Sequence, residues 1–375
     1  MSTGTPVTKA STFFRNRART GFRRSRASFL AAVRITVCAV TAYVIAERVL
    51  GHQGPLFAAT SAVVALGFSS GPRLRKVLEV AIGCTLGIAV GDLLLHFLGA
   101  GIWQAAVVLL ISILLARFLD SGSIFSTQLA MQSVLVVLLP APEGGPFTRS
   151  IDAIVGGSLA LIATMLIPGD PRSEPRTKLQ RLLGELAAVL RECSNALGKS
   201  DPTIAWHALV RARGSQKLVD EVRSTFVGAH EVARISPAYR RHRAEVVDLQ
   251  HAAEMTDLAM RNSRVFSRRL TSAINHAAMG DEAIANLSEV LQDAAEAVEI
   301  LATGLSDSDS RARERRLENA RDELASIAGR LHPKDLGVQT MEGEALVVVF
   351  RPLMVDLLEA TGLSHEDAAA ALPRL

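Results

Sequence analysis

The chain has 375 residues, of which 49% are hydrophobic and 5% aromatic, and this length is sufficient for two domains. Charge is divided unequally, because residues 1–168 hold 14 basic and 6 acidic residues, whereas residues 169–375 hold 27 basic and 31 acidic residues. The positive excess therefore falls in the apolar half, which indicates a membrane surface as partner and argues against nucleic acid. The three cysteines are scattered, so the sequence indicates neither a disulfide framework nor a metal site.

Residues 1–28 carry seven basic residues and no acid, which predicts a cytoplasmic tail on anionic lipid. A disordered tail that only sets the topology is the alternative. The apolar stretch 29–50 predicts a first membrane span, with Arg34 one turn inside its cytoplasmic end. The second span, 54–70, is short, but the tail and the basic loop of Arg73, Arg75 and Lys76 both favour the cytoplasm. An even number of crossings must therefore separate them.

The third span, 77–98, is the most informative stretch of the chain. Its glycines recur every fourth residue, at Gly83, Gly87 and Gly91. In a membrane helix this spacing makes a flat stripe on which another backbone packs closely, and we prefer that interpretation to a pore wall. Asp92 lies within the same span, where an acid is a candidate for function.

Three further spans are predicted at 101–117, 123–139 and 151–167. Gln128 and Gln132 share one face of the fifth span, and Gly156 and Gly157 lie at mid-depth in the sixth. With the N-terminus inside, 14 basic residues face the cytoplasm and two, Arg48 and Arg149, face outside. The sequence thus predicts a six-helix transmembrane domain over 29–168 in the cell membrane, with both termini cytoplasmic.

Polar groups at membrane depth are the candidates for function. Arg34 and Glu79 fall near the cytoplasmic face of spans one and three, and Arg48 and Asp92 fall toward the outer face of the same spans. Either couple can be a structural ion pair. The two glutamines can be interhelical hydrogen-bond partners or groups that line a substrate path.

From Arg172 onward the pattern is that of amphipathic helices, which predicts a cytoplasmic all-helical domain over 172–375. Asp201-Pro202 and Ser236-Pro237 are helix-opening signals, and Asp281 is predicted to cap a helix that ends near 305. A further helix is predicted over 306–331, and a buried one over 344–361. Ser364-x-x-Asp367 is predicted to cap a last short helix.

Motifs for catalysis are missing from the sequence: it has no phosphate-binding glycine loop, no HExxH, no paired CxxC and no serine elbow. Its nine histidines are dispersed, and the arginine runs at 240–243, 268–269 and 311–316 are interleaved with acids, as on solvated helix faces. The sequence therefore predicts that the protein is not an enzyme and uses no cofactor.

Three stretches of the first half resemble the fusaric acid resistance and aromatic acid exporter superfamily of bacterial membrane proteins. They are residues 54–94, which contain GPLFAATSAVVALGFSSGPRLRK; residues 125–139, FSTQLAMQSVLVVLL; and residues 149–168, RSIDAIVGGSLALIATMLIP. The resemblance implies a six-helix membrane module, a cytoplasmic helical domain, and export of aromatic or other organic anions. The superfamily is also similar to plant malate channels, and larger relatives carry two membrane modules where this chain has one.

The main hypothesis is an exporter of small organic anions, either proton-linked or passive. Its path would use the basic cytoplasmic residues Arg34, Arg73, Arg75 and Lys76 together with Gln128 and Gln132, and Asp92 would be the proton site. The alternative is a membrane-anchored scaffold that presents a partner-binding helical domain. A homodimer is predicted, because two copies would reproduce the two-module relatives.

Overall fold

The structure is a computed structural model that describes residues 29–67, 74–99, 101–119, 122–139, 145, 147–166, 170–235, 239–277 and 279–375. Contacts divide the chain into two compact units, Met1–Gly169 and Asp170–Leu375. Every regular element in the described ranges is a helix, so the predicted all-helical class is confirmed. The membrane crossings and the cytoplasmic location of the second unit stay predictions.

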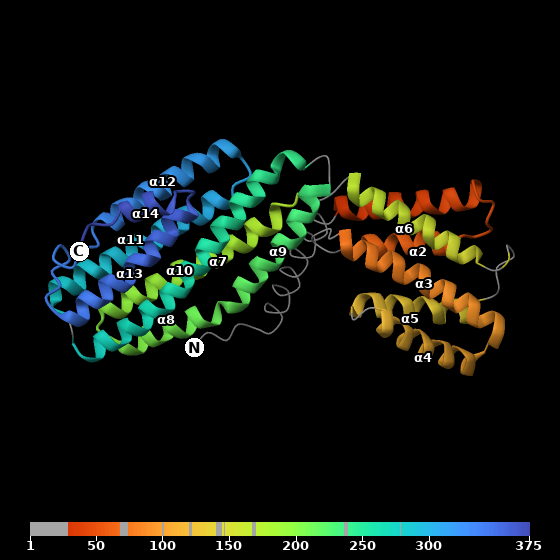
Figure 1. Cartoon of the computed structure of the whole chain (residues 1–375), viewed down its shortest axis with the longest axis horizontal. Coiled ribbons are helices and arrows are strands. Elements are labelled where there is room, and N and C mark those ends of the chain that lie inside the picture. Colours follow the sequence, from red (N-terminus) through yellow and green to blue (C-terminus); the bar gives the residue numbers. More distant parts are fainter. Residues whose placement is uncertain are drawn as a thin grey trace, which may run out of the picture. The chain divides into compact units, whose positions relative to one another are not determined.

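The described part of the first unit consists of six helices, which Figure 1 shows side by side. Their bounds are Phe29–Arg48, α2 Leu56–Leu66, α3 Leu74–Leu98, α4 Ile102–Leu119, α5 Ser123–Leu138 and α6 Thr148–Leu166. Each lies within one of the predicted spans or differs from it by a few residues. Four are long and apolar enough to cross a bilayer, whereas α2 and α5 are shorter, with 11 and 16 residues. Gly99, with φ +75°, ends α3 in a conformation that favours glycine.

The glycine stripe of α3 lies against the backbone of α5. A Cβ added at Gly87 would lie 2.9 Å from the Leu129 Cα, and one added at Gly91 would lie 2.8 Å from the Ser133 carbonyl oxygen. Such distances are shorter than real Cβ contacts, so only glycine permits this approach. Because Gly87 meets Leu129 and Gly91 meets Ser133, the helices α3 and α5 run parallel to each other.

The paired glycines of α6 serve two other neighbours. A Cβ at Gly156 would overlap the Ala58 carbonyl group of α2, and one at Gly157 would lie 3.0 Å from the Ala81 Cβ of α3. Ala81 therefore lies level with Gly157, and the later α3 residue Asp92 lies beside the earlier α6 residue Arg149. The helices α3 and α6 are thus antiparallel, as consecutive crossings of one membrane would require for a third and a sixth span.

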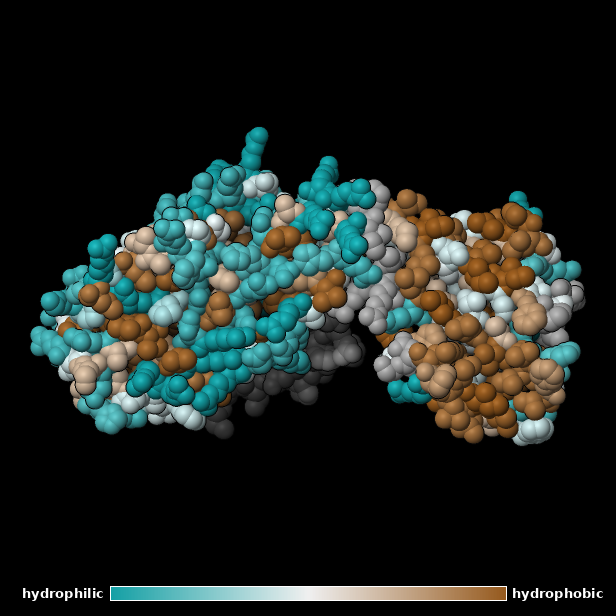
Figure 2. All heavy atoms as spheres, in the orientation of Figure 1, coloured by the Kyte–Doolittle hydropathy of each residue, from teal (hydrophilic) through white to brown (hydrophobic). Residues whose placement is uncertain are grey.

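The surface of the first unit is apolar. Among the described residues, 33 large apolar side chains are exposed in 29–166, against 9 in 170–375. Figure 2 shows the difference as an extensive hydrophobic surface on the first unit and a mostly hydrophilic one on the second. Helix α4 exposes Ile102, Trp103 and Phe118 by 88%, 63% and 87%. At roughly 25 cal/mol per Å² of apolar surface, water is an unfavourable solvent for this unit, and a lipid bilayer is the favourable one.

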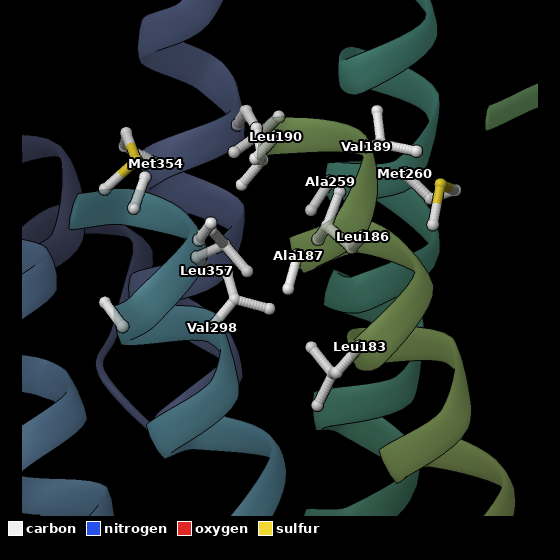
Figure 3. Close-up of a cluster of buried hydrophobic side chains, with 14 of the residues drawn as sticks. Leu183, Leu186, Ala187, Val189, Leu190, Ala259, Met260, Val298, Met354 and Leu357 are labelled. Atoms are coloured by element: carbon white, nitrogen blue, oxygen red, sulfur yellow. The ribbon is translucent and has the colours of Figure 1, made fainter. Parts of the chain in front are cut away.

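The second unit packs its described helices around one apolar core. Their bounds are α7 Ser173–Gly198, α8 Pro202–Gly214, α9 Gln216–Ile235, α10 Arg243–Asn275, α11 Asp281–Ser306, α12 Ser310–Gly329, α13 Met341–Ala360 and α14 His365–Ala370, with a 3-10 turn, Arg240–His242, before α10. Figure 3 shows side chains of α7, α10, α11 and α13 meeting in the core, among them Leu186, Val298 and Leu357. The rings of Phe266 and Phe350 pack at 5.0 Å between centroids.

Several predicted helix boundaries of the second unit are confirmed. The Asp201 side chain accepts a hydrogen bond from the Thr203 amide, and the Ser364 hydroxyl accepts one from the Asp367 amide. The predicted buried helix over 344–361 is α13.

Other boundaries were wrong. Asp281 is the first residue of α11 and follows its N-cap, Gly280. Helix α12 begins at Ser310, after an Asp309 cap, because the Asp309 carboxylate satisfies the Arg311 amide. The boundary at Ser215, which separates α8 from α9, was not predicted. Ser236-Pro237 lies outside the described residues.

Candidate functional site

Asp92 and Arg149 form a buried charge couple between α3 and α6. Arg149 Nη1 lies 3.9 Å from Asp92 Oδ1, and each side chain is 7% exposed. The same Nη1 donates a hydrogen bond of 2.9 Å to the Val136 carbonyl oxygen of α5, and the guanidinium lies 5.6 Å from the Phe57 ring centroid of α2. Four helices thus hold one arginine. Among the described residues, Asp92 Oδ2 has no hydrogen-bond partner.

A second polar couple lies one helical turn along α6. His52 Nδ1, in the connection between the first helix and α2, is 2.6 Å from Asp152 Oδ1. Asp152 is three residues after Arg149, so the two side chains share a face of the helix. Together, His52, Asp92, Arg149 and Asp152 make a polar cluster in which His52 is partly buried and the other three side chains are buried. Polar groups enclosed in this way are candidates for function in a membrane protein.

The predicted couple of Arg48 with Asp92 was wrong. Arg48 is exposed at the end of the first helix, and the charged partner of Asp92 is Arg149. Arg149 was assigned to an outer loop because the sixth span was predicted to begin at 151, whereas α6 begins at Thr148. The Arg149-x-x-Asp152 spacing was the available signal, since residues three apart on a helix are neighbours. Nothing in the sequence around His52 indicates its partner.

The basic residues of the predicted path are described only in part. Arg34 is half-buried on the first helix, and its pairing with Glu79 stays a prediction. Arg73 lies outside the described residues. Arg75 and Lys76 belong to the first turn of α3, but their side chains are also outside the description.

Gln128 and Gln132 converge on one residue of α3. The Cys84 thiol lies 3.6 Å from Gln128 Oε1, and Gln132 Nε2 lies 3.7 Å from the Cys84 sulfur. Cys84 follows Gly83 in the stripe, so this contact lies within the α3–α5 packing surface. It has the geometry of interhelical hydrogen bonds, which contribute about 0.6 kcal/mol each in membrane proteins. Within the described ranges, no three His, Cys, Asp or Glu side chains gather as a metal site requires.

Residues 37–163, which include His52, Asp92, Arg149 and Asp152, match the family described as fusaric acid resistance protein-like. A protein of Corynebacterium glutamicum, named "Uncharacterized protein", is 31% identical to this chain over 358 residues, which cover 93% of this chain and 89% of that protein. Proteins of Mycobacterium tuberculosis and Mycobacterium bovis, each named "Putative arylamide transporter", are 31% identical over 291 residues, or 73% of this chain and 76% of theirs. These matches, together with the apolar helices, show that the chain belongs to the fusaric acid resistance protein-like family of membrane proteins.

Proposed function

We propose that the protein transports small organic anions, aromatic acids foremost, out of the cell across the cytoplasmic membrane. Membership of the family and the name of the mycobacterial relatives support transport of small molecules. The antiparallel directions of α3 and α6 fit six crossings, and the basic tail and loops favour the cytoplasm for both termini. The excess of basic residues on the cytoplasmic side supports anions as substrates, since positive charge at Arg34, Arg73, Arg75 and Lys76 would concentrate them.

The buried couple of Asp92 and Arg149 carries this proposal. Four helices surround the guanidinium, and the Arg149 side chain is 7% exposed, so the couple offers a cation that an organic anion could bind away from water. The ionised Asp92 carboxylate neutralises Arg149. Once Asp92 takes a proton, the Asp92–Arg149 couple has a net charge of one positive unit, which the carboxylate of an organic anion can balance. A proton on Asp92 therefore accompanies each bound anion, and the site stays neutral.

The two glutamines have a smaller part in this proposal than the sequence indicated. Their contacts with Cys84 favour the interhelical role over a role in the substrate path. The basic residues near the cytoplasmic face stay in the proposal as the site where anions first collect.

Transport by the full-length protein in hydroxybenzoate-loaded liposomes tests the proposal across a pH series. Arg149→Gln should abolish release. Asp92→Asn imitates the protonated carboxyl, so release should continue but lose its dependence on pH. Glu47→Gln, at an exposed position near the end of the first helix, is the control and should behave as wild type. Unchanged, pH-dependent release from both cluster variants would remove the couple from the mechanism, and voltage-driven, pH-independent release by the wild type would favour a passive channel.

A homodimer belongs to the same proposal. The stripe of Gly83, Gly87 and Gly91 is covered by α5 of the same subunit. This packing leaves the helices of residues 172–375 as the favoured contact between two copies. Mass photometry in mild detergent gives the stoichiometry. A 40.1 kDa particle that still transports substrate would exclude the dimer. If the protein transports nothing but retains a stoichiometric partner, the scaffold alternative is favoured.

A further inference from the structure

The positive charge of the second unit is concentrated in three segments. Residues 170–178, 231–245 and 307–316 together hold 11 basic and 7 acidic residues, a net charge of +4. The rest of 170–375 holds 16 basic and 24 acidic residues, a net charge of −8. The three segments are far apart in the sequence, so they can form one positively charged surface only if the fold brings them together.

One carboxylate on α10, Glu245, joins all three segments. Arg172 Nη1 donates a hydrogen bond of 2.6 Å to Glu245 Oε2, Arg176 is hydrogen-bonded to Oε1, and Arg313 Nη1 lies 2.6 Å from Oε1. Burial opposes the ionisation of Glu245, but the hydrogen bond from Arg172 and the charges of the three arginines outweigh it and hold the pKa of Glu245 below its usual range. The carboxylate is therefore charged at neutral pH and keeps the starts of α7, α10 and α12 at one end of the unit.

We call this end of the second unit the basic end; it consists of Arg172, Arg176, Tyr239–Arg243 and Arg311–Arg316. While Glu245 occupies the inner arginines, the outer ones are exposed: Arg240, Arg241, Arg243, Arg311, Arg315 and Arg316. In the described part of the chain, Arg240, Arg241 and Arg243 take part in no ion pair. Tyr239 packs beside His242 at 6.1 Å between ring centroids, and tyrosine is enriched where proteins meet the headgroup layer.

The basic end is also where the chain enters the second unit. Asp170 follows the last residue of α6, Leu166, by four positions, a length of chain that reaches at most about 14 Å. We infer that the basic end of residues 170–375 binds the anionic headgroups of the membrane in which the first unit lies. Arginines near an anionic leaflet each add to the attraction, and the acidic remainder of the unit is repelled by the same surface.

Hydrogen exchange of the full-length protein in nanodiscs tests this inference. One lipid preparation contains phosphatidylcholine alone, and the other adds phosphatidylglycerol. Peptides covering 239–245 and 311–316 should exchange about tenfold more slowly with phosphatidylglycerol, and high salt should remove the difference. The double variant Arg240→Glu, Arg241→Glu should lose it. The matched control, Arg268→Glu with Arg269→Glu, reverses two exposed arginines of α10, about 40 Å from the 3-10 turn that holds Arg240 and Arg241, and should keep it.

Three outcomes would overturn the inference. The first is equal exchange in the two lipids by the wild-type protein, a measurement that needs no variant to fold. The second is the same loss of protection in the control as in the Arg240, Arg241 variant. The third is protection by hydroxybenzoate in phosphatidylcholine nanodiscs without any effect of phosphatidylglycerol, which would identify the basic end as a site for soluble anions.

Discussion

The two units of this chain are both built from helices, but they differ in whether apolar or charged side chains are buried. The first exposes its large apolar side chains and encloses charged ones, among them Asp92 and Arg149. The second encloses leucines and phenylalanines and exposes most of its charges, as at Arg268 and Arg269. Helices therefore form in both units, and the surrounding solvent determines which face of each helix is buried.

The units also differ in what brings their helices together. In the second, apolar side chains of α7, α10, α11 and α13 interlock around pairs such as Phe266 and Phe350, and expulsion of water drives that packing. In the first, lipid is as apolar as the side chains, so association depends on close backbone contact at glycines. Replacement of glycine by a larger residue should therefore have opposite consequences on the α3 stripe and at an open helix position of the second unit such as Gly184.

The largest effect is expected on the α3 stripe. Gly87→Leu places a side chain against the Leu129 backbone, which cannot move aside, so the first unit should lose its fold; overpacking costs 1–3 kcal/mol even where neighbours adjust. Size-exclusion chromatography in mild detergent should show the loss of the monodisperse peak. The alanine series Gly87→Ala, Gly91→Ala, Gly83→Ala should grade from severe to mild, because the nearest backbone oxygen is most distant at Gly83, at 3.2 Å. Equal stability across the series would refute backbone packing as the cause.

An intermediate effect is expected at Asp356, an acid buried in the second unit without an arginine. Burial raises its pKa from 3.8 to about 6, against the hydrogen bond of 2.6 Å donated by Asn262 Nδ2. The folded state then holds a proton that the unfolded state has released, so stability falls as the pH rises from about 4 to about 6. Asp356→Asn removes this loss and should raise the free energy of unfolding at neutral pH by up to about 3 kcal/mol.

Urea titrations of the detergent-solubilised chain measure the Asp356 effect. Trp206 fluorescence in a Trp103→Phe background reports on the second unit alone, since the chain has two tryptophans. Asp322→Asn, at an exposed position of α12, is the control. The same pH dependence in Asp356→Asn as in the wild type would assign the slope to another group.

The smallest effect, and one of opposite sign to the stripe, is expected at Gly184. This residue lies in the middle of α7 on its exposed side, and a Cβ added there meets nothing within 4 Å. Gly184→Ala should stabilise the second unit by up to about 1 kcal/mol, because alanine has the higher helix propensity. The same urea titration measures it. If Gly184→Ala destabilised the second unit, tight packing at glycine could not explain the difference between Gly184 and the α3 stripe.

Local signals determined much of this protein. The glycine spacing 83, 87, 91, the length of the apolar stretches and the caps at Asp201 and Ser364 are properties of neighbouring residues. They predicted the helices and, through the resemblance of three stretches, the family. Boundaries were less accurate where two capping residues compete within one turn, as at Ser306 and Asp309 before α12.

Only the tertiary structure decided which residues meet. Asp92 has Arg149 as its partner and not Arg48, and His52 lies beside Asp152, 100 positions along the chain. In the same way Glu245 joins Arg176 of α7 and Arg313 of α12. Such pairs depend on the rotation and relative depth of packed helices. Hydrophobic periodicity determines neither the rotation nor the depth, because an apolar stripe can pack against a neighbour at many rotations. A buried charge is stable only in the one rotation that places it next to its charged partner.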